Sequence, residues 1–181
     1  ASKRSLLPPV VEARIRTGDM HRELGRLGAA DRLLRDAIAA AERAGLADLV
    51  VLGLLSLART SAAQGDADGA ATLLDWAAEA AATAEAPELS VQTAAFRVRQ
   101  QLQGGDLPAA ARWARGRDPG SVEPASDAQQ VERLTLARYL IAAGEAEKAT
   151  RLLAALADDA EQHGRRTQLL EIQVLQALAL D

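Results

Sequence analysis

Apolar residues recur along this chain at helical spacing, and the blocks they form are separated by glycine or proline. Leu33, Leu34, Ala37, Ile38 and Ala41, for example, fall on one face of a helix. The pattern predicts about nine helices, over about 8–24, 28–44, 47–63, 66–84, 87–102, 108–115, 126–143, 146–163 and 165–180. The only long predicted loop, 115–125, is rich in Gly, Pro, Ser and Asp. An all-α chain is therefore expected.

The helices form a repeat. The segment 134–149, LTLARYLIAAGEAEKA, matches 55–70, LSLARTSAAQGDADGA, at half of its sixteen positions. Glycines spaced by 40, 40 and 39 residues mark four copies, at Gly25, Gly65, Gly105 and Gly144. An alanine stands five residues after each glycine, and a small residue stands seven before it in every copy but one. A period of this size indicates a solenoid of stacked helical hairpins.

Two kinds of repeat have to be distinguished. HEAT-type repeats have a period close to this one, whereas the glycine turn with its flanking small residues is the tetratricopeptide (TPR) pattern. We therefore predict a right-handed superhelical solenoid of TPR-like hairpins with a period of about 40, as a single domain over 1–181. Its repeats would be 8–45, 46–86, 87–125 and 126–164, followed by an unpaired helix over 165–181.

Composition adds limits to this picture. Hydrophobic residues make up 49% of the chain but aromatic residues only 2%, so alanine and leucine must build the core. The chain has no cysteine for a disulfide or a thiolate metal site. No apolar run approaches the roughly 18 residues of a membrane span, and no signal peptide is present. Because it starts at Ala1 without Met and stops inside a helical pattern, we expect a piece of a larger cytoplasmic protein.

Known catalytic motifs are missing. The sequence holds no GxxxxGK, HExxH or GxSxG motif, and His21 and His163 lie in distant repeats. His163 precedes Gly164, where it can meet the free carbonyls at a helix end. Trp76 and Trp113 both fall on outer helices, where packing is the first expectation. We expect no enzyme activity, no metal and no cofactor in this chain.

One constellation points to binding. In a TPR solenoid the residue six before the turn glycine faces the concave surface, and here that position holds Asp19, Arg59, Arg99 and Arg138. Apolar residues flank this row one turn away, at Leu55, Leu134 and Ile141. Guanidinium groups in a groove suit a ligand that carries a carboxylate or another anion. The alternative, that each arginine bridges a carboxylate on the adjacent helix, remains open.

The residues resemble a known family. LTLARYLIAAGEAEKATRLLAALADDAEQHGRRTQLLEIQVLQALAL, over 134–180, is similar to the helical-repeat region of the large ATP-dependent LuxR-type, MalT-like transcriptional regulators. HRELGRLGAADRLLRDAI, LARTSAAQGDADGAATLLDWA and QGGDLPAAARWAR extend the similarity over nearly the whole chain.

The resemblance implies a function. In that family the repeats receive a small-molecule inducer or a regulatory protein and are linked to self-association. ATP binding and DNA binding are implied only for flanking modules that this chain does not contain. The alternative is a stand-alone TPR scaffold that binds a peptide or protein partner, with no role in transcription.

Self-association is also expected from the last helix. Its apolar residues spread around the helix although its natural partner helix is missing, and they are Leu169, Leu170, Ile172, Val174, Leu175 and Leu178. Exposed apolar patches usually mark an interaction site.

A first prediction concerns DNA. The net charge is −4, and the predicted arginine row lies in a groove and not on a protruding helix, so the chain should not bind duplex DNA specifically. An electrophoretic mobility assay at increasing salt measures this. A salt-sensitive, sequence-specific shift would contradict the prediction.

Overall fold

The computed structural model describes residues 7–117 and 126–180, and within these ranges every regular element is an α-helix. The helices are α1 (Leu7–Glu23), α2 (Leu27–Ala44), α3 (Ala47–Ala63), α4 (Ala67–Thr83), α5 (Pro87–Gln103), α6 (Leu107–Ala114), α7 (Asp127–Ala142), α8 (Ala146–Gln162) and α9 (Arg166–Leu180). Each predicted helix is present with bounds within a few residues, so the all-α prediction is confirmed. Most of the predicted loop 115–125 lies outside the described residues.

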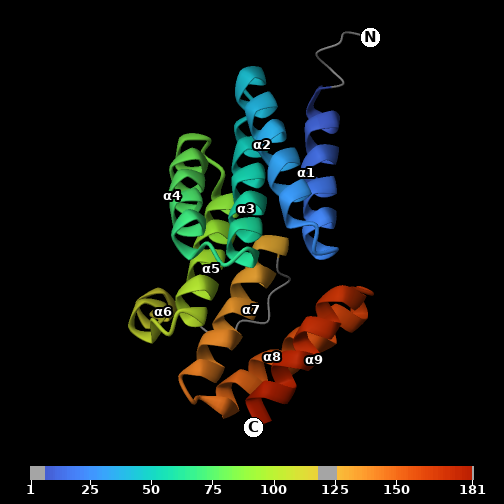
Figure 1. Cartoon of the computed structure of the whole chain (residues 1–181). Helices are drawn as coiled ribbons and strands as arrows, with labels where there is room; N and C mark the ends of the chain where they lie inside the picture. The colour runs from blue at the N-terminus through green and yellow to red at the C-terminus, as the bar shows by residue number, and fades with distance from the viewer. Residues whose placement is uncertain (1–6, 118–125, 181) are drawn as a thin grey trace. The chain divides into compact units, whose positions relative to one another are not determined.

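The first compact unit covers 1–93 and contains two complete helical hairpins. Each of its helices packs against the next along the chain, and the two inner helices α1 and α3 also contact each other. Figure 1 shows α1 to α4 running side by side in alternating directions. Fully buried alanines such as Ala37, Ala41 and Ala77 let the helices approach closely. This is the arrangement that TPR-like hairpins predict.

The second compact unit covers 94–181. Here α7 packs against α6 and α8, and α9 contacts both α8 and the preceding inner helix α7. Its core consists of buried leucines, isoleucine and alanines from α7, α8 and α9. The boundary between the units falls inside α5, which runs through it as one continuous helix.

The turns follow the sequence signals. Gly65 takes a left-handed backbone with φ of 83°, and Asp66 then caps the start of α4. The Asp66 carboxylate accepts hydrogen bonds from the Gly69 amide at 2.9 Å and the Ser61 hydroxyl at 3.0 Å. The hydrogen bond from the Gly69 amide, and to a smaller extent the one from Ser61, hold the pKa of Asp66 below its usual value. Asp66 is therefore the N-cap residue of α4.

Close helix packing explains the small residue that stands seven before the turn glycine. In α1 this residue is Gly18, and a Cβ added there would lie 2.6 Å from Cγ and Cδ2 of Leu34 in α2. Leu34 is itself completely buried, so it has no room to move away. A larger residue at this position would therefore push the inner and outer helices apart.

This packing gives a second prediction. Gly18→Ala should destabilise the protein, because overpacking costs about 1–3 kcal/mol and exceeds the ~0.5–1 kcal/mol that alanine gains over glycine inside a helix. Gly28→Ala in α2 is the matched control, since the nearest atom to its added Cβ is the flexible Arg32 Nη1 at 3.8 Å. Urea denaturation followed by circular dichroism measures both free energies of unfolding. Equal stability of the two variants would contradict the prediction.

Candidate functional site

The residues predicted for the groove fall into both units. Asp19, Leu55 and Arg59 belong to the first unit. The remaining four belong to the second unit, namely Arg99, Leu134, Arg138 and Ile141.

In the first unit the predicted residues line one cleft between the inner helices α1 and α3. Its cavity volume is about 150 Å³, the size of a cavity that holds one benzene molecule. Ile15, Leu52 and Leu55 form its apolar wall, and its polar lining consists of Glu12, Arg16, Asp19, Ser56, Arg59 and Gln92. The convergence of Asp19, Leu55 and Arg59 follows from the repeat, because equivalent positions of adjacent inner helices lie next to each other.

Asp19 is the most enclosed acid of this cleft. Its Oδ2 accepts a hydrogen bond of 3.0 Å from the hydroxyl of Ser56, which is almost fully buried. Its Oδ1 is buried, makes no hydrogen bond, and lies 3.7 Å from Nη2 of Arg22. The carboxylate therefore retains capacity to accept a further donor.

Glu12 and Arg16 form the exposed rim. Arg16 Nη2 lies 2.7 Å from Glu12 Oε1, within one helix, and their side chains are 77% and 47% exposed, Arg16 first. Such an exposed pair contributes little to stability. The two side chains can therefore rearrange around a bound molecule.

In the second unit the arginines meet an acid. Arg138 Nη2 lies 2.9 Å from Oε1 of Glu171 in α9, and Arg99 Nη2 lies 3.5 Å from the same oxygen. Arg99 also donates from Nε to the buried hydroxyl of Thr135 at 3.0 Å. These two arginines thus show the carboxylate-bridging arrangement that the sequence left open as the alternative. Their role in ligand binding stays a prediction.

The predicted apolar flanks are largely structural. Leu55 and Leu134 are each 2% exposed, and Ile141 is half-buried against the core of the second unit. Glu171, Ser56 and Gln92 were not singled out from the sequence. Their register within the repeat is the signal that could have found them, because it places them on the inner face beside the predicted row.

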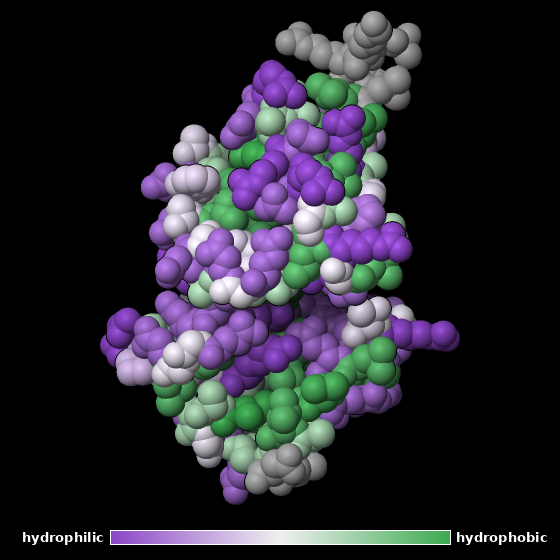
Figure 2. Space-filling model, in the orientation of Figure 1, coloured by the Kyte–Doolittle hydropathy of each residue, from purple (hydrophilic) through white to green (hydrophobic). Residues whose placement is uncertain are grey.

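The last helix has two different apolar faces. Ile172 and Leu175 are each 1% exposed and belong to the core that includes α8. Leu170, Val174 and Leu178 are 65%, 61% and 53% exposed and stand one turn apart. Figure 2 shows a hydrophobic band in the lower part of the view, where Figure 1 places α8 and α9. We call these three residues the α9 stripe.

The repeat register explains the α9 stripe. Leu170 and Val174 follow the left-handed Gly164 by six and ten residues, as Val51 and Leu55 follow the left-handed Gly45. Val51 and Leu55 are buried in the first unit, because neighbouring helices cover that side of α3. Leu170 and Val174 thus lie on the side of an inner helix that is covered in α3, and Leu178, one turn further on, occupies the register position of Arg59.

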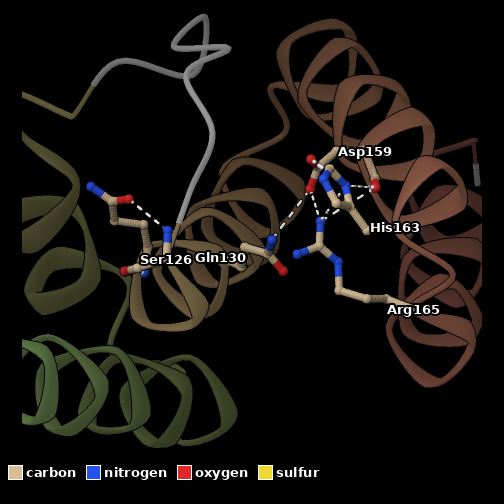
Figure 3. Close-up of polar contacts among 6 residues, drawn as sticks. Ser126, Gln130, Asp159, His163 and Arg165 are labelled. Carbon is tan, nitrogen blue, oxygen red and sulfur yellow. Dashed lines mark hydrogen bonds and ion pairs between the residues drawn. The ribbon is translucent and has the colours of Figure 1, made fainter.

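A polar cluster joins α7 to the end of α8 (Figure 3). Asp159 accepts a hydrogen bond of 3.2 Å from Nε2 of buried Gln130 and pairs with Arg165. His163 Nδ1 lies 2.8 Å from the backbone oxygen of Asp159, which confirms the predicted contact with the helix-end carbonyls. At the start of α7, Ser126 forms a capping box with Gln129. The cluster thus ties the end of α8 to α7 and caps the start of α7.

The two tryptophans differ. Trp113 packs against the core of the second unit, and the Arg117 guanidinium carbon lies 4.1 Å from its ring centroid. Trp76 on α4 is 54% exposed, so packing accounts for only part of its side chain. Among the described residues no group of three or more histidine, aspartate or glutamate side chains is arranged to hold a metal ion.

Comparisons with known proteins complete the picture. The family model of the MalT-like TPR region matches residues 2–181. No curated protein and no solved structure matches the chain significantly. Among the helices of the described residues, none combines the length and the apolar character needed to cross a membrane.

Proposed function

Because the chain belongs to the family of MalT-like TPR regions, we propose that it is the effector-sensing and protein-interaction domain of a LuxR-type bacterial transcriptional regulator in the cytoplasm. The observation that carries the proposal is the cleft between α1 and α3. Three residues predicted from the repeat alone, Asp19, Leu55 and Arg59, line it together. We propose this cleft as the effector site.

The character of the cleft supports binding. Effector sites are concave, with apolar walls and a few polar groups that fix the orientation of the ligand. This cleft has an apolar wall and charged groups of both signs. We propose that the cleft serves recognition without catalysis.

Ligand binding in this cleft would stabilise the contact between the first two hairpins. α1 and α3 belong to different repeats, and a molecule held by side chains of both resists their separation. The stabilisation follows RT ln(1 + [L]/Kd), about 2.7 kcal/mol at a hundredfold excess of ligand over Kd. Stabilisation of the contact between α1 and α3 can affect the neighbouring repeats, because each repeat packs on the next.

A third prediction tests the effector site in a regulator that carries this region. Asp19→Asn and Arg59→Met remove one charge each while keeping side-chain size, and each should weaken the response to inducer about tenfold or more. Arg14→Met is the matched control, because Arg14 is exposed on α1 and does not line the cleft. A transcriptional reporter measures the response, and thermal unfolding confirms that each variant folds.

The same assay separates the two groups of groove residues. Arg99→Ala and Arg138→Ala remove the arginines that meet Glu171, and they test the anion site predicted for the second unit. A full response in folded Asp19→Asn and Arg59→Met would exclude the α1–α3 cleft as effector site. Loss of response in the Arg99 and Arg138 variants alone would move the site to the second unit.

We further propose that the α9 stripe mediates self-association, with a second copy of this chain as the partner. Its three residues are exposed, apolar and aligned. Two such helices packed face to face would supply each other with the neighbour that α3 has in its own unit. Leu175, also expected on this surface from the sequence, faces the core instead.

A fourth prediction follows. The double variant Val174→Gln, Leu178→Gln should weaken self-association at least about tenfold, because each buried apolar side chain contributes about 1.5–3 kcal/mol. Val10→Gln is the control, since Val10 is an exposed apolar residue on α1. Sedimentation velocity over a range of concentrations measures the equilibrium. A strict monomer at high concentration, or the same association in the double variant, would exclude this interface.

A further inference from the structure

We infer that the cleft between α1 and α3 binds a small zwitterion, a free α-amino acid with a short aliphatic side chain. The inference rests on the proposed function, because it takes this cleft as the effector site. The charges, the hydrogen-bonding capacity and the size of the cleft together determine the chemical class of the ligand.

The repeat register places neutral residues in the first unit at the position where the second unit has an acid. In the second unit Arg138 meets Glu171, which lies 33 residues further along the chain. The same step of 33 leads from Asp19 to Leu52 and from Arg59 to Gln92, and all four of these residues line the cleft. Leu52 and Gln92 are neutral, so the position that neutralises Arg138 supplies no opposite charge to Asp19 or Arg59.

The cleft lining carries equal numbers of positive and negative side chains. The lining holds two carboxylates, Glu12 and Asp19, and two guanidiniums, Arg16 and Arg59. A simple anion would be attracted by the two arginines but repelled by the two acids. A simple cation would be attracted by the acids but repelled by the arginines. A ligand with one charge of each sign meets both, and its net charge of zero leaves the balance unchanged.

Asp19 and Ser56 form the proposed subsite for the ammonium group. Asp19 Oδ1 is buried and makes no hydrogen bond, with Arg22 Nη2 3.7 Å away, so it can still accept a hydrogen bond from a ligand donor. Ser56 donates its hydroxyl proton to Asp19 Oδ2, so the lone pairs of its oxygen remain as acceptors. An ammonium group has three donors and can use both residues at once.

Arg59 supplies the proposed subsite for the carboxylate group. It stands on α3 at the repeat position that Asp19 occupies on α1, six residues before the turn glycine. Its guanidinium has five N–H donors in a planar fork, so it can hold a ligand carboxylate in addition to its contacts within the protein. The ligand's two charged groups would thus be held by two different repeats.

Size and the apolar wall define the rest of the ligand. A cavity of about 150 Å³ accommodates a molecule of benzene size, which suits a short aliphatic amino acid and not an aromatic one. The aliphatic side chain would lie against Ile15, Leu52 and Leu55. L-valine combines all of these features and is the probe for the test.

The experiment is isothermal titration calorimetry of the chain with three probes. L-valine carries both charges, isovalerate lacks the ammonium group, and isobutylamine lacks the carboxylate. We expect L-valine to bind and each single-charge probe to bind at least about tenfold more weakly, because each loses a charge-assisted hydrogen bond. L-tryptophan should not bind.

Variants identify the two subsites. Asp19→Asn should weaken L-valine binding about tenfold but leave isovalerate binding nearly unchanged. Arg59→Met should weaken L-valine binding by a similar factor but leave isobutylamine binding nearly unchanged. The exposed Arg14→Met should bind L-valine like the original chain. These selective losses distinguish ligand contact from general destabilisation, which would affect all probes alike.

The outcomes separate this inference from the proposed function. Absence of L-valine binding, or equal binding of isovalerate, would overturn the zwitterion. If the Asp19 and Arg59 variants then still abolish the inducer response, the cleft remains the effector site for another ligand. If they do not, the proposed site fails as well.

Discussion

The structure depends on the close crossing of the inner and outer helix within each hairpin. At Gly18 no side chain separates the backbone of α1 from Leu34, and in two of the other three hairpins the equivalent residues Ala58 and Ala137 are fully buried. With almost no aromatic residues available, these short distances supply the dispersion contacts that larger side chains provide elsewhere. They also fix how each helix is rotated, and therefore which residues reach the inner face.

Because the rotation of the inner helices is fixed, the same repeat position reaches the same face in each of them, but its surroundings differ. The position six before the turn glycine always reaches the inner face, yet it holds an acid in α1 and an arginine in α3, α5 and α7. What this side chain meets is decided by the next inner helix. Arg138 meets Glu171 in the second unit, whereas in the first unit the corresponding residues are Leu52 and Gln92.

Much of this organisation could be predicted from the sequence, because it depends on local periodicity. The helices, the left-handed glycines and the convergence of Asp19 with Arg59 all follow from spacing that the chain repeats. The pairing of Arg99 and Arg138 with Glu171 did not follow, since it joins different helices and depends on side-chain conformations. The same holds for Gln130 and Asp159, which are 29 residues apart.

The last helix shows why periodicity alone has limits. Its apolar residues surround the helix, so the sequence does not tell which face is buried. Packing against α8 selects Ile172 and Leu175 and leaves Leu170, Val174 and Leu178 exposed. Leu170 and Val174 occupy the positions at which α3 is covered by its neighbours, so the same helix that completes one core offers a surface for the next contact. In a solenoid, the same repeat position is therefore buried where another helix follows and available for binding where none does.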